Sequence, residues 1–159
     1  MGVVLAFLFA WAGWRVFEYR WYAGIIPAHL GISHPIAIAG QSSIREGCGA
    51  AIFRMDEATA TKIAEQGKHY LARSMVSRSH QDSYHTFFGW QETPVKTVGA
   101  PRAEGSSLSP GLYCASVDAE LESTILRAVR VPGAYYTLGP EKFLLVDPAE
   151  RLIVLSYDG

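Results

Sequence analysis

The chain has 159 residues, of which 49% are hydrophobic and 18% charged, and its formal net charge is −1. This length allows one domain of about 100–150 residues and a short additional segment. The near-neutral charge, together with the lack of a basic stripe or an RNA-binding motif, argues against a nucleic-acid partner.

The first 24 residues are predicted to form a membrane helix. Residues 2–14 hold no charge, and the first 40 residues hold only Arg15, Glu18 and Arg20. Long charged side chains near a helix end reach the head groups, where aromatic residues also gather. The sequence therefore predicts a short or tilted single-pass anchor over residues 1–24 that contacts the lipid bilayer. The residues expected at the membrane interface are Trp11, Trp14, Arg15, Phe17, Tyr19, Arg20, Trp21 and Tyr22.

Two alternatives to the membrane anchor are a cleaved signal peptide and a buried helix. Ala10-Trp11-Ala12 offers a cleavage site, but no basic residue precedes the short apolar stretch. A buried helix is disfavoured because a helix that is apolar on every face is rare in a small protein. An anchor ahead of a domain with a possible disulfide favours an extracytoplasmic, periplasmic domain. Arg15 and Arg20 after the apolar run favour the alternative, a cytoplasmic domain.

Residues 25–40 are predicted to be a linker, and residues 41–159 a globular domain. Pro27 and Pro35 interrupt the apolar linker, because proline removes a backbone donor and clashes with the preceding helical turn. We therefore expect an extended conformation for this segment.

The pattern of the domain predicts an α+β fold. Asp56 is a helix N-cap, and apolar residues recur at three-and-four spacing after it. The apolar runs near the C-terminus flank a turn at residues 147–150 and predict a β-hairpin. We expect a mostly antiparallel sheet with two helices on one face. The predicted strands are 48–55, 84–90, 111–115, 134–138, 142–147 and 151–157; the predicted helices are 57–73 and about 116–129; residues 91–110 are a predicted loop.

Two cysteines, Cys48 and Cys114, lie in predicted strands. They are either buried free thiols or one disulfide, since no Cys-x-x-Cys pair exists to bind zinc. A disulfide would close a loop of about 65 residues and contribute roughly 4 kcal/mol in the chain-entropy model.

No catalytic motif is recognisable, so the chain is predicted not to be an enzyme and to need no cofactor. His80, Asp82 and His85 are candidate metal ligands, because imidazole and carboxylate groups bind divalent ions. Their spacing matches no strong metal signature, and solvated loop histidines are the alternative interpretation.

Aromatic residues in the predicted strands offer a candidate binding face, or else belong to the sheet core. Side chains alternate between the two faces of a strand, so some of these residues must point outward. The residues are Phe87, Phe88, Trp90, Tyr135 and Tyr136.

These features predict a membrane-anchored, non-enzymatic accessory subunit of a larger membrane complex. Its partner would be a membrane protein, and its α+β domain would supply a contact surface. Residues 48–67 and 133–159 resemble small bacterial envelope proteins but indicate no family. One alternative is an envelope metal-binding protein or enzyme that uses His80, Asp82 and His85. Another is a ligand-binding domain that uses the aromatic face.

Overall fold

The computed structural model describes residues 2–42, 47–73, 75–95 and 108–159. Its centre is a six-stranded sheet in the order β1-β2-β6-β5-β4-β3, and every neighbouring pair is antiparallel. The strands are β1 (Ile32–Ser42), β2 (Gly47–Met55), β3 (Gln91–Glu92), β4 (Tyr135–Gly139), β5 (Lys142–Asp147) and β6 (Leu152–Asp158).

Strands β5 and β6 are buried on both faces. Alternate residues of β6 contribute to two separate apolar clusters: Ile153 and Leu155 to one, Val154 to the other. This alternation follows from the two-residue period of a strand. The predicted hairpin is confirmed, and its turn is closed by Asp147, whose Oδ1 accepts hydrogen bonds from the backbone N–H of Ala149 and of Glu150.

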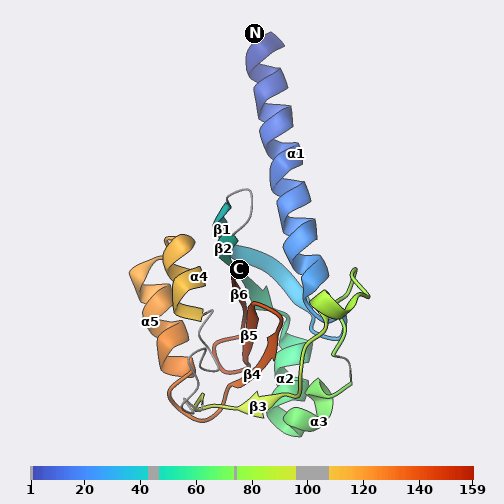
Figure 1. The fold of residues 1–159 in the computed structure, drawn as a ribbon, viewed down its shortest axis with the longest axis vertical. Coiled ribbons are helices and arrows are strands. Elements are labelled where there is room, and N and C mark those ends of the chain that lie inside the picture. Colours follow the sequence, from blue (N-terminus) through green and yellow to red (C-terminus); the bar gives the residue numbers. More distant parts are fainter. Residues whose placement is uncertain (1, 43–46, 74, 96–107) are drawn as a thin grey trace.

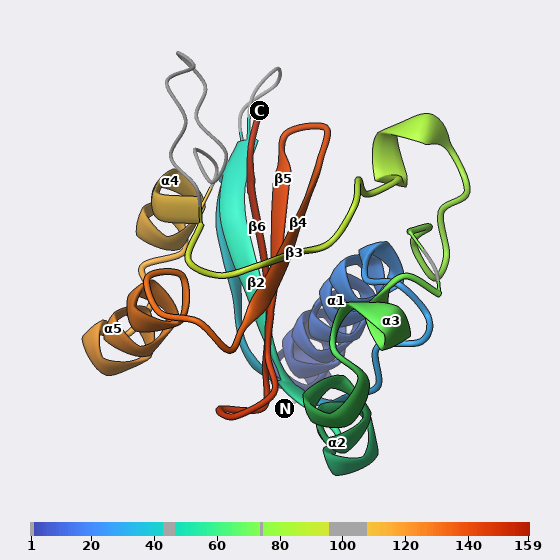
Figure 2. The same cartoon turned by 90° about the horizontal axis from the view of Figure 1, so that it is seen from below.

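Helices cover both faces of the sheet. Figure 2 shows α1 (Gly2–Ile25), α2 (Glu57–Gln66) and α3 (Lys68–Leu71) on one side, and α4 (Leu108–Cys114) and α5 (Ala119–Ala128) on the other. The α+β class and the antiparallel sheet are therefore confirmed. The prediction of two helices on one face is wrong, because the central strands bury apolar side chains on both of their faces and both need cover.

The helix after β2 begins as predicted and is then interrupted. Asp56 accepts a hydrogen bond from the backbone N–H of Thr59 at 2.7 Å, which caps α2. Gly67 has a φ of 53° and separates α2 from α3. A positive φ is readily adopted by glycine, so the chain turns here and the predicted continuous helix over 57–73 becomes two.

The predicted strand at residues 111–115 is helical instead. This segment belongs to α4, in which Leu108 and Leu112 are both buried. Their four-residue spacing places both side chains on the face of α4 that packs against the sheet. The following helix, α5, is capped by Asp118, whose side chain accepts hydrogen bonds from the backbone N–H groups of Glu120 and Leu121.

The predicted strand at residues 84–90 does not form a regular ladder. A 3₁₀ turn, η1 (Ser83–His85), begins it, and the backbone N–H groups of Phe87 and Phe88 then bond to Met75 and Leu138 respectively. The aromatic pattern was strand-like, but its hydrogen-bond partners lie on two different segments. Residues 96–107 of the predicted 91–110 loop lie outside the described residues.

Part of the predicted linker forms the edge strand β1. Its register against β2 shifts around His34 and again after Pro35. An edge strand tolerates proline, because one side of its backbone needs no ladder hydrogen bonds.

The predicted transmembrane segment requires a correction. Across the described parts of the chain, no helix is long and apolar enough to cross a membrane, which contradicts the predicted single-pass membrane localisation. The uncharged residues 2–14 extend only about 20 Å at about 1.5 Å per residue, whereas the hydrocarbon layer is about 30 Å thick. The three charges that follow interrupt the apolar stretch.

Candidate functional site

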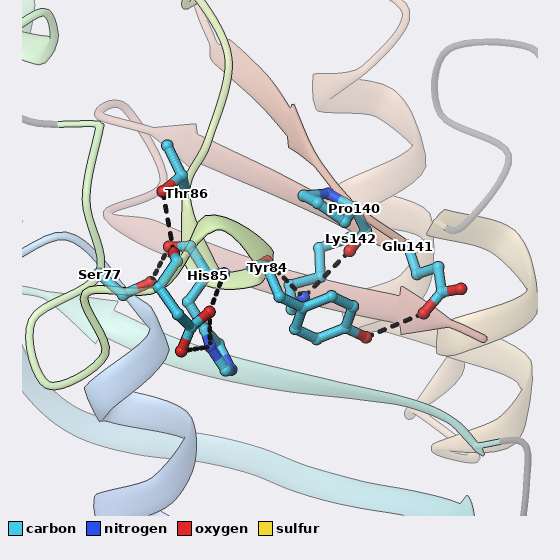
Figure 3. A network of polar contacts seen from close by, with 8 residues as sticks. Ser77, Tyr84, His85, Thr86, Pro140, Glu141 and Lys142 are labelled. Atoms are coloured by element: carbon cyan, nitrogen blue, oxygen red, sulfur yellow. Dashed lines mark hydrogen bonds and ion pairs between the residues drawn. The ribbon is translucent and has the colours of Figure 1, made fainter.

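The structure brings His80, Asp82 and His85 together beside the C-terminal end of α1. One ligand atom from each residue lies within 4.8 Å of those from the other two. The rings of His80 and His85 are stacked, with their centroids 4.3 Å apart. The Asp82 carboxylate accepts a hydrogen bond from His85 Nδ1, with N···O distances of 2.8 and 2.9 Å (Figure 3).

The local backbone explains how Asp82 and His85 meet. Asp82 caps η1, and its Oδ1 also accepts from the backbone N–H of His85 at 2.9 Å. Ser77 Oγ donates to the carbonyl of His85, and Thr86 Oγ1 donates to the carbonyl of Asp82. The hydrogen bonds from His85 are the main cause that lowers the pKa of Asp82. The carboxylate is therefore negatively charged near neutral pH.

The position of His80 depends on α1. The backbone N–H groups of Arg78 and Ser79 donate to the carbonyls of Ile26 and Gly24, at 3.1 and 2.9 Å. These bonds satisfy backbone acceptors at and just beyond the helix end. The Trp21 ring meets the His80 ring edge-on, at a centroid distance of 5.0 Å. The cluster thus joins a loop to the helix base.

A pocket of about 210 Å³ opens next to the cluster, between α1 and the sheet. His85 belongs to both the cluster and the pocket wall. The other lining residues are Trp21, Tyr22, Ile25, Tyr84, Lys142, Leu155 and Tyr157.

Lys142 is a buried cation in this wall. Its Nζ donates to the carbonyls of Tyr84 and Pro140 and lies 3.2 Å from the centroid of the Tyr84 ring (Figure 3). Burial lowers the pKa of Lys142 to about 8, although the charges of Glu141 and Asp82 oppose this shift. Burial also raises the pKa of Tyr84 to about 12, helped by the hydrogen bond from its hydroxyl to Glu141.

The side chains of two further tyrosines, Tyr22 and Tyr157, also line the pocket. The hydroxyl oxygens of Tyr22 and Tyr157 are 2.7 Å apart, and their rings are stacked. Burial, followed by the hydrogen bond to Tyr157, raises the pKa of Tyr22. The pocket wall therefore offers the neutral hydroxyls of Tyr22 and Tyr84 and the ammonium group of Lys142 near neutral pH.

The predicted aromatic binding face is divided between the core and the surface. Phe87, Trp90 and Tyr136 are buried, whereas Phe88 is 60% exposed and Tyr135 is partly buried. The five aromatic residues therefore do not form a single exposed surface.

The residues predicted for a membrane interface also divide into two groups. Trp11, Trp14 and Phe17 are exposed, whereas Tyr19 and Tyr22 pack against the domain. Of the others in this predicted set, Arg15, Arg20 and Trp21 are also exposed. The contact of this helix with a lipid bilayer stays a prediction.

Cys48 of β2 and Cys114 of α4 form a disulfide, with a Cα–Cα distance of 5.8 Å. It attaches the helix layer of α4 and α5 to the sheet, on the face opposite α1.

The pocket residues Tyr84, Lys142 and Tyr157 belong to no functional motif in the sequence. The position of Lys142 at the start of an apolar strand could have indicated that it is buried, because a lysine next to a buried strand often packs its aliphatic stem against the core. No sequence pattern predicts that the two tyrosines line a pocket, because they lie near α1 only through contacts between segments that are distant in the chain.

Comparison of the chain with models of protein families, with curated proteins and with solved structures found no match.

Proposed function

We propose that this protein is a non-enzymatic interaction protein that inserts the N-terminal part of α1 into an apolar groove of a partner protein. The observation that carries the proposal is the exposure of this helix. Its large apolar side chains from residue 3 to residue 17 are between 50% and 76% exposed, and the helix extends beyond the rest of the molecule (Figure 1). Monomeric proteins rarely expose apolar patches larger than a few hundred Å².

The distribution of these side chains defines the shape of the partner surface. Consecutive residues of a helix are rotated by about 100°, so Phe7 and Phe9 lie on nearly opposite faces. Both are more than 70% exposed. A flat surface would cover only one of them, whereas a groove between helices of a partner would cover both.

The length and charge of the helix favour protein over lipid. The uncharged part ends at Trp14 after about 20 Å, and Arg15 then forms an exposed 2.6 Å ion pair with Glu18. A protein groove can supply polar partners at this point, whereas the hydrocarbon of a bilayer cannot.

The base of α1 supports such an insertion because it is fixed to the domain. Ala23, Ile25 and Ile26 are buried, and Tyr19 packs edge-on against Phe53 of β2. The exposed part is therefore presented by a rigid element. Binding then costs little ordering entropy, which favours affinity. The α+β domain holds the base of this helix. The role of the domain itself as a contact surface stays a prediction.

Site-specific photo-crosslinking in the native host tests the proposal. Crosslinkers at Phe7 and Phe9 should both capture the same partner protein, because a groove surrounds the helix. A crosslinker at Tyr113, which is 83% exposed on α4, is the matched control and should not capture it. With the purified partner, Phe9→Glu should weaken binding at least tenfold, and Tyr113→Glu should leave it unchanged.

Other outcomes would reject the proposal. Capture from Phe7 and Phe9 of different proteins, or of none, would mean that no groove surrounds the helix. Association with vesicles of zwitterionic lipid without a protein crosslink would identify lipid as the occupant instead.

A further inference from the structure

We propose that His80, Asp82 and His85 bind one divalent transition-metal ion such as Zn²⁺. This site lies at the base of α1, and its test is independent of the proposed interaction at the other end of that helix. The sequence offered these three residues as candidates, and the structure adds their proximity and the elements that hold them.

The three residues supply a suitable set of donor atoms. Two imidazole nitrogens and one carboxylate oxygen are ligands that favour Zn²⁺ and neighbouring transition ions, whereas Ca²⁺ and Mg²⁺ prefer oxygen ligands alone. The carboxylate ligand also supplies a negative charge that partly compensates the charge of the ion.

The distances between the donor atoms of the three residues are close to those expected around a bound metal ion. Donor atoms about 2.1 Å from a tetrahedral ion lie about 3.4 Å from one another. The donor atoms here lie within 4.8 Å, so the widest pair must approach by up to about 1.4 Å. The Asp82 side chain is 56% exposed and so has room to adjust its position.

The cluster is held in place before any ion binds. Trp21 lies against the His80 ring, and the Ser79 backbone is bonded to Gly24 at the end of α1. Gly24 also provides space, since a Cβ there would lie 3.0 Å from Ser79 Cβ and 3.5 Å from His80 Nε2. The negative end of the dipole of α1 is beside the cluster, which favours a cation.

Three protein ligands leave one position of a tetrahedral ion open. Zinc sites with three protein ligands hold a water or another small ligand at the fourth position. His85 also lines the neighbouring 210 Å³ pocket, so a ligand in that pocket would lie beside the ion.

The test is metal binding to the full-length protein, purified without a polyhistidine tag and stripped with a chelator. Titration with Zn²⁺, followed by calorimetry, should show one saturable ion per chain. Co²⁺ should produce a visible absorption band of a four-coordinate site. His80→Ala and His85→Ala should each weaken binding at least about tenfold.

Two further variants control for folding and for surface histidines. Asp82→Asn keeps the capping oxygen for η1 but removes the charge, so it should weaken binding while the circular dichroism spectrum stays unchanged. His69→Ala removes an exposed histidine of α3 and should leave binding unaltered. The absence of saturable binding, or an equal loss in His69→Ala, would overturn the proposal.

Discussion

At the scale of single residues, Gly111 and Gly89 have different structural roles. Gly111 lies where α4 approaches β2 and β6, and a Cβ there would overlap Ser156 Oγ and come within 2.5 Å of the carbonyl oxygen of Gly49. Gly89 has no heavy atom within 4 Å of the corresponding position. Only the first glycine is therefore required by close packing.

Gly111→Ala should lower the free energy of unfolding by about 2 kcal/mol, because added volume in a packed contact forces its neighbours apart. It should also break the buried hydrogen bond from Ser156 Oγ to the carbonyl of Leu108. Gly89→Ala, the matched control, should change stability by less than about 0.5 kcal/mol. Urea unfolding of the two variants measures the difference, and equal values would contradict the packing argument.

The proximity of the candidate metal-binding residues could not be predicted from the sequence. His80 and His85 are five residues apart, and this spacing implies no contact in a loop. They meet because η1 turns the chain and α1 holds the backbone before His80. The three candidate ligands were visible in the sequence, but their proximity was not.

At the scale of elements, β6 is the strand on which the sheet depends. It pairs with β2 on one side and β5 on the other, and its residues Leu152–Ser156 are buried. The continuous apolar run of this strand already indicated a central position, because a strand buried on both faces has no polar alternation.

A chain that ends at Glu150 lacks β6 and should lose cooperative thermal unfolding, as followed by circular dichroism. Deletion of residues 2–14 is the control, because their described side chains are exposed. That deletion should leave the melting transition cooperative. A cooperative transition in the chain without β6 would show that β2 and β5 can form the core by themselves.

Two of the mispredicted segments share one physical cause. Residues 84–90 and 111–115 are short apolar segments, and such segments fit either a helix or a strand by local pattern. In the structure, Gly111 lets a helix approach the sheet closely, whereas Phe87 and Phe88 bond to two different segments. The longer apolar strands β5 and β6 were predicted correctly, whereas the periodic segment 57–73 was correctly predicted as helical but is divided at Gly67.

At the scale of the whole molecule, the disulfide between Cys48 and Cys114 links two layers that are distant in sequence. The two residues are separated by 66 positions. In the chain-entropy model, a closed loop of this size stabilises the folded state by about 4 kcal/mol, because it restricts the unfolded chain.

The double variant Cys48→Ala/Cys114→Ala should therefore lose about 4 kcal/mol in denaturant unfolding. Reduction of the natural protein should produce a similar loss, and the same reductant should not affect the double variant. An unchanged unfolding midpoint in the double variant would mean that packing between α4 and the sheet holds the two layers without the bond.

The sequence by itself determined the α+β class, the cap at Asp56, the strands β2, β5 and β6, and the C-terminal hairpin. These features are encoded in local residue patterns. Only the tertiary structure decided that helices cover both faces, that residues 32–42 pair as an edge strand, and that His80, Asp82 and His85 meet. The physical reason is that each of these features depends on contacts between distant segments. The end of α1, for example, bonds to Arg78 and Ser79. Such contacts leave no periodic signal in the chain.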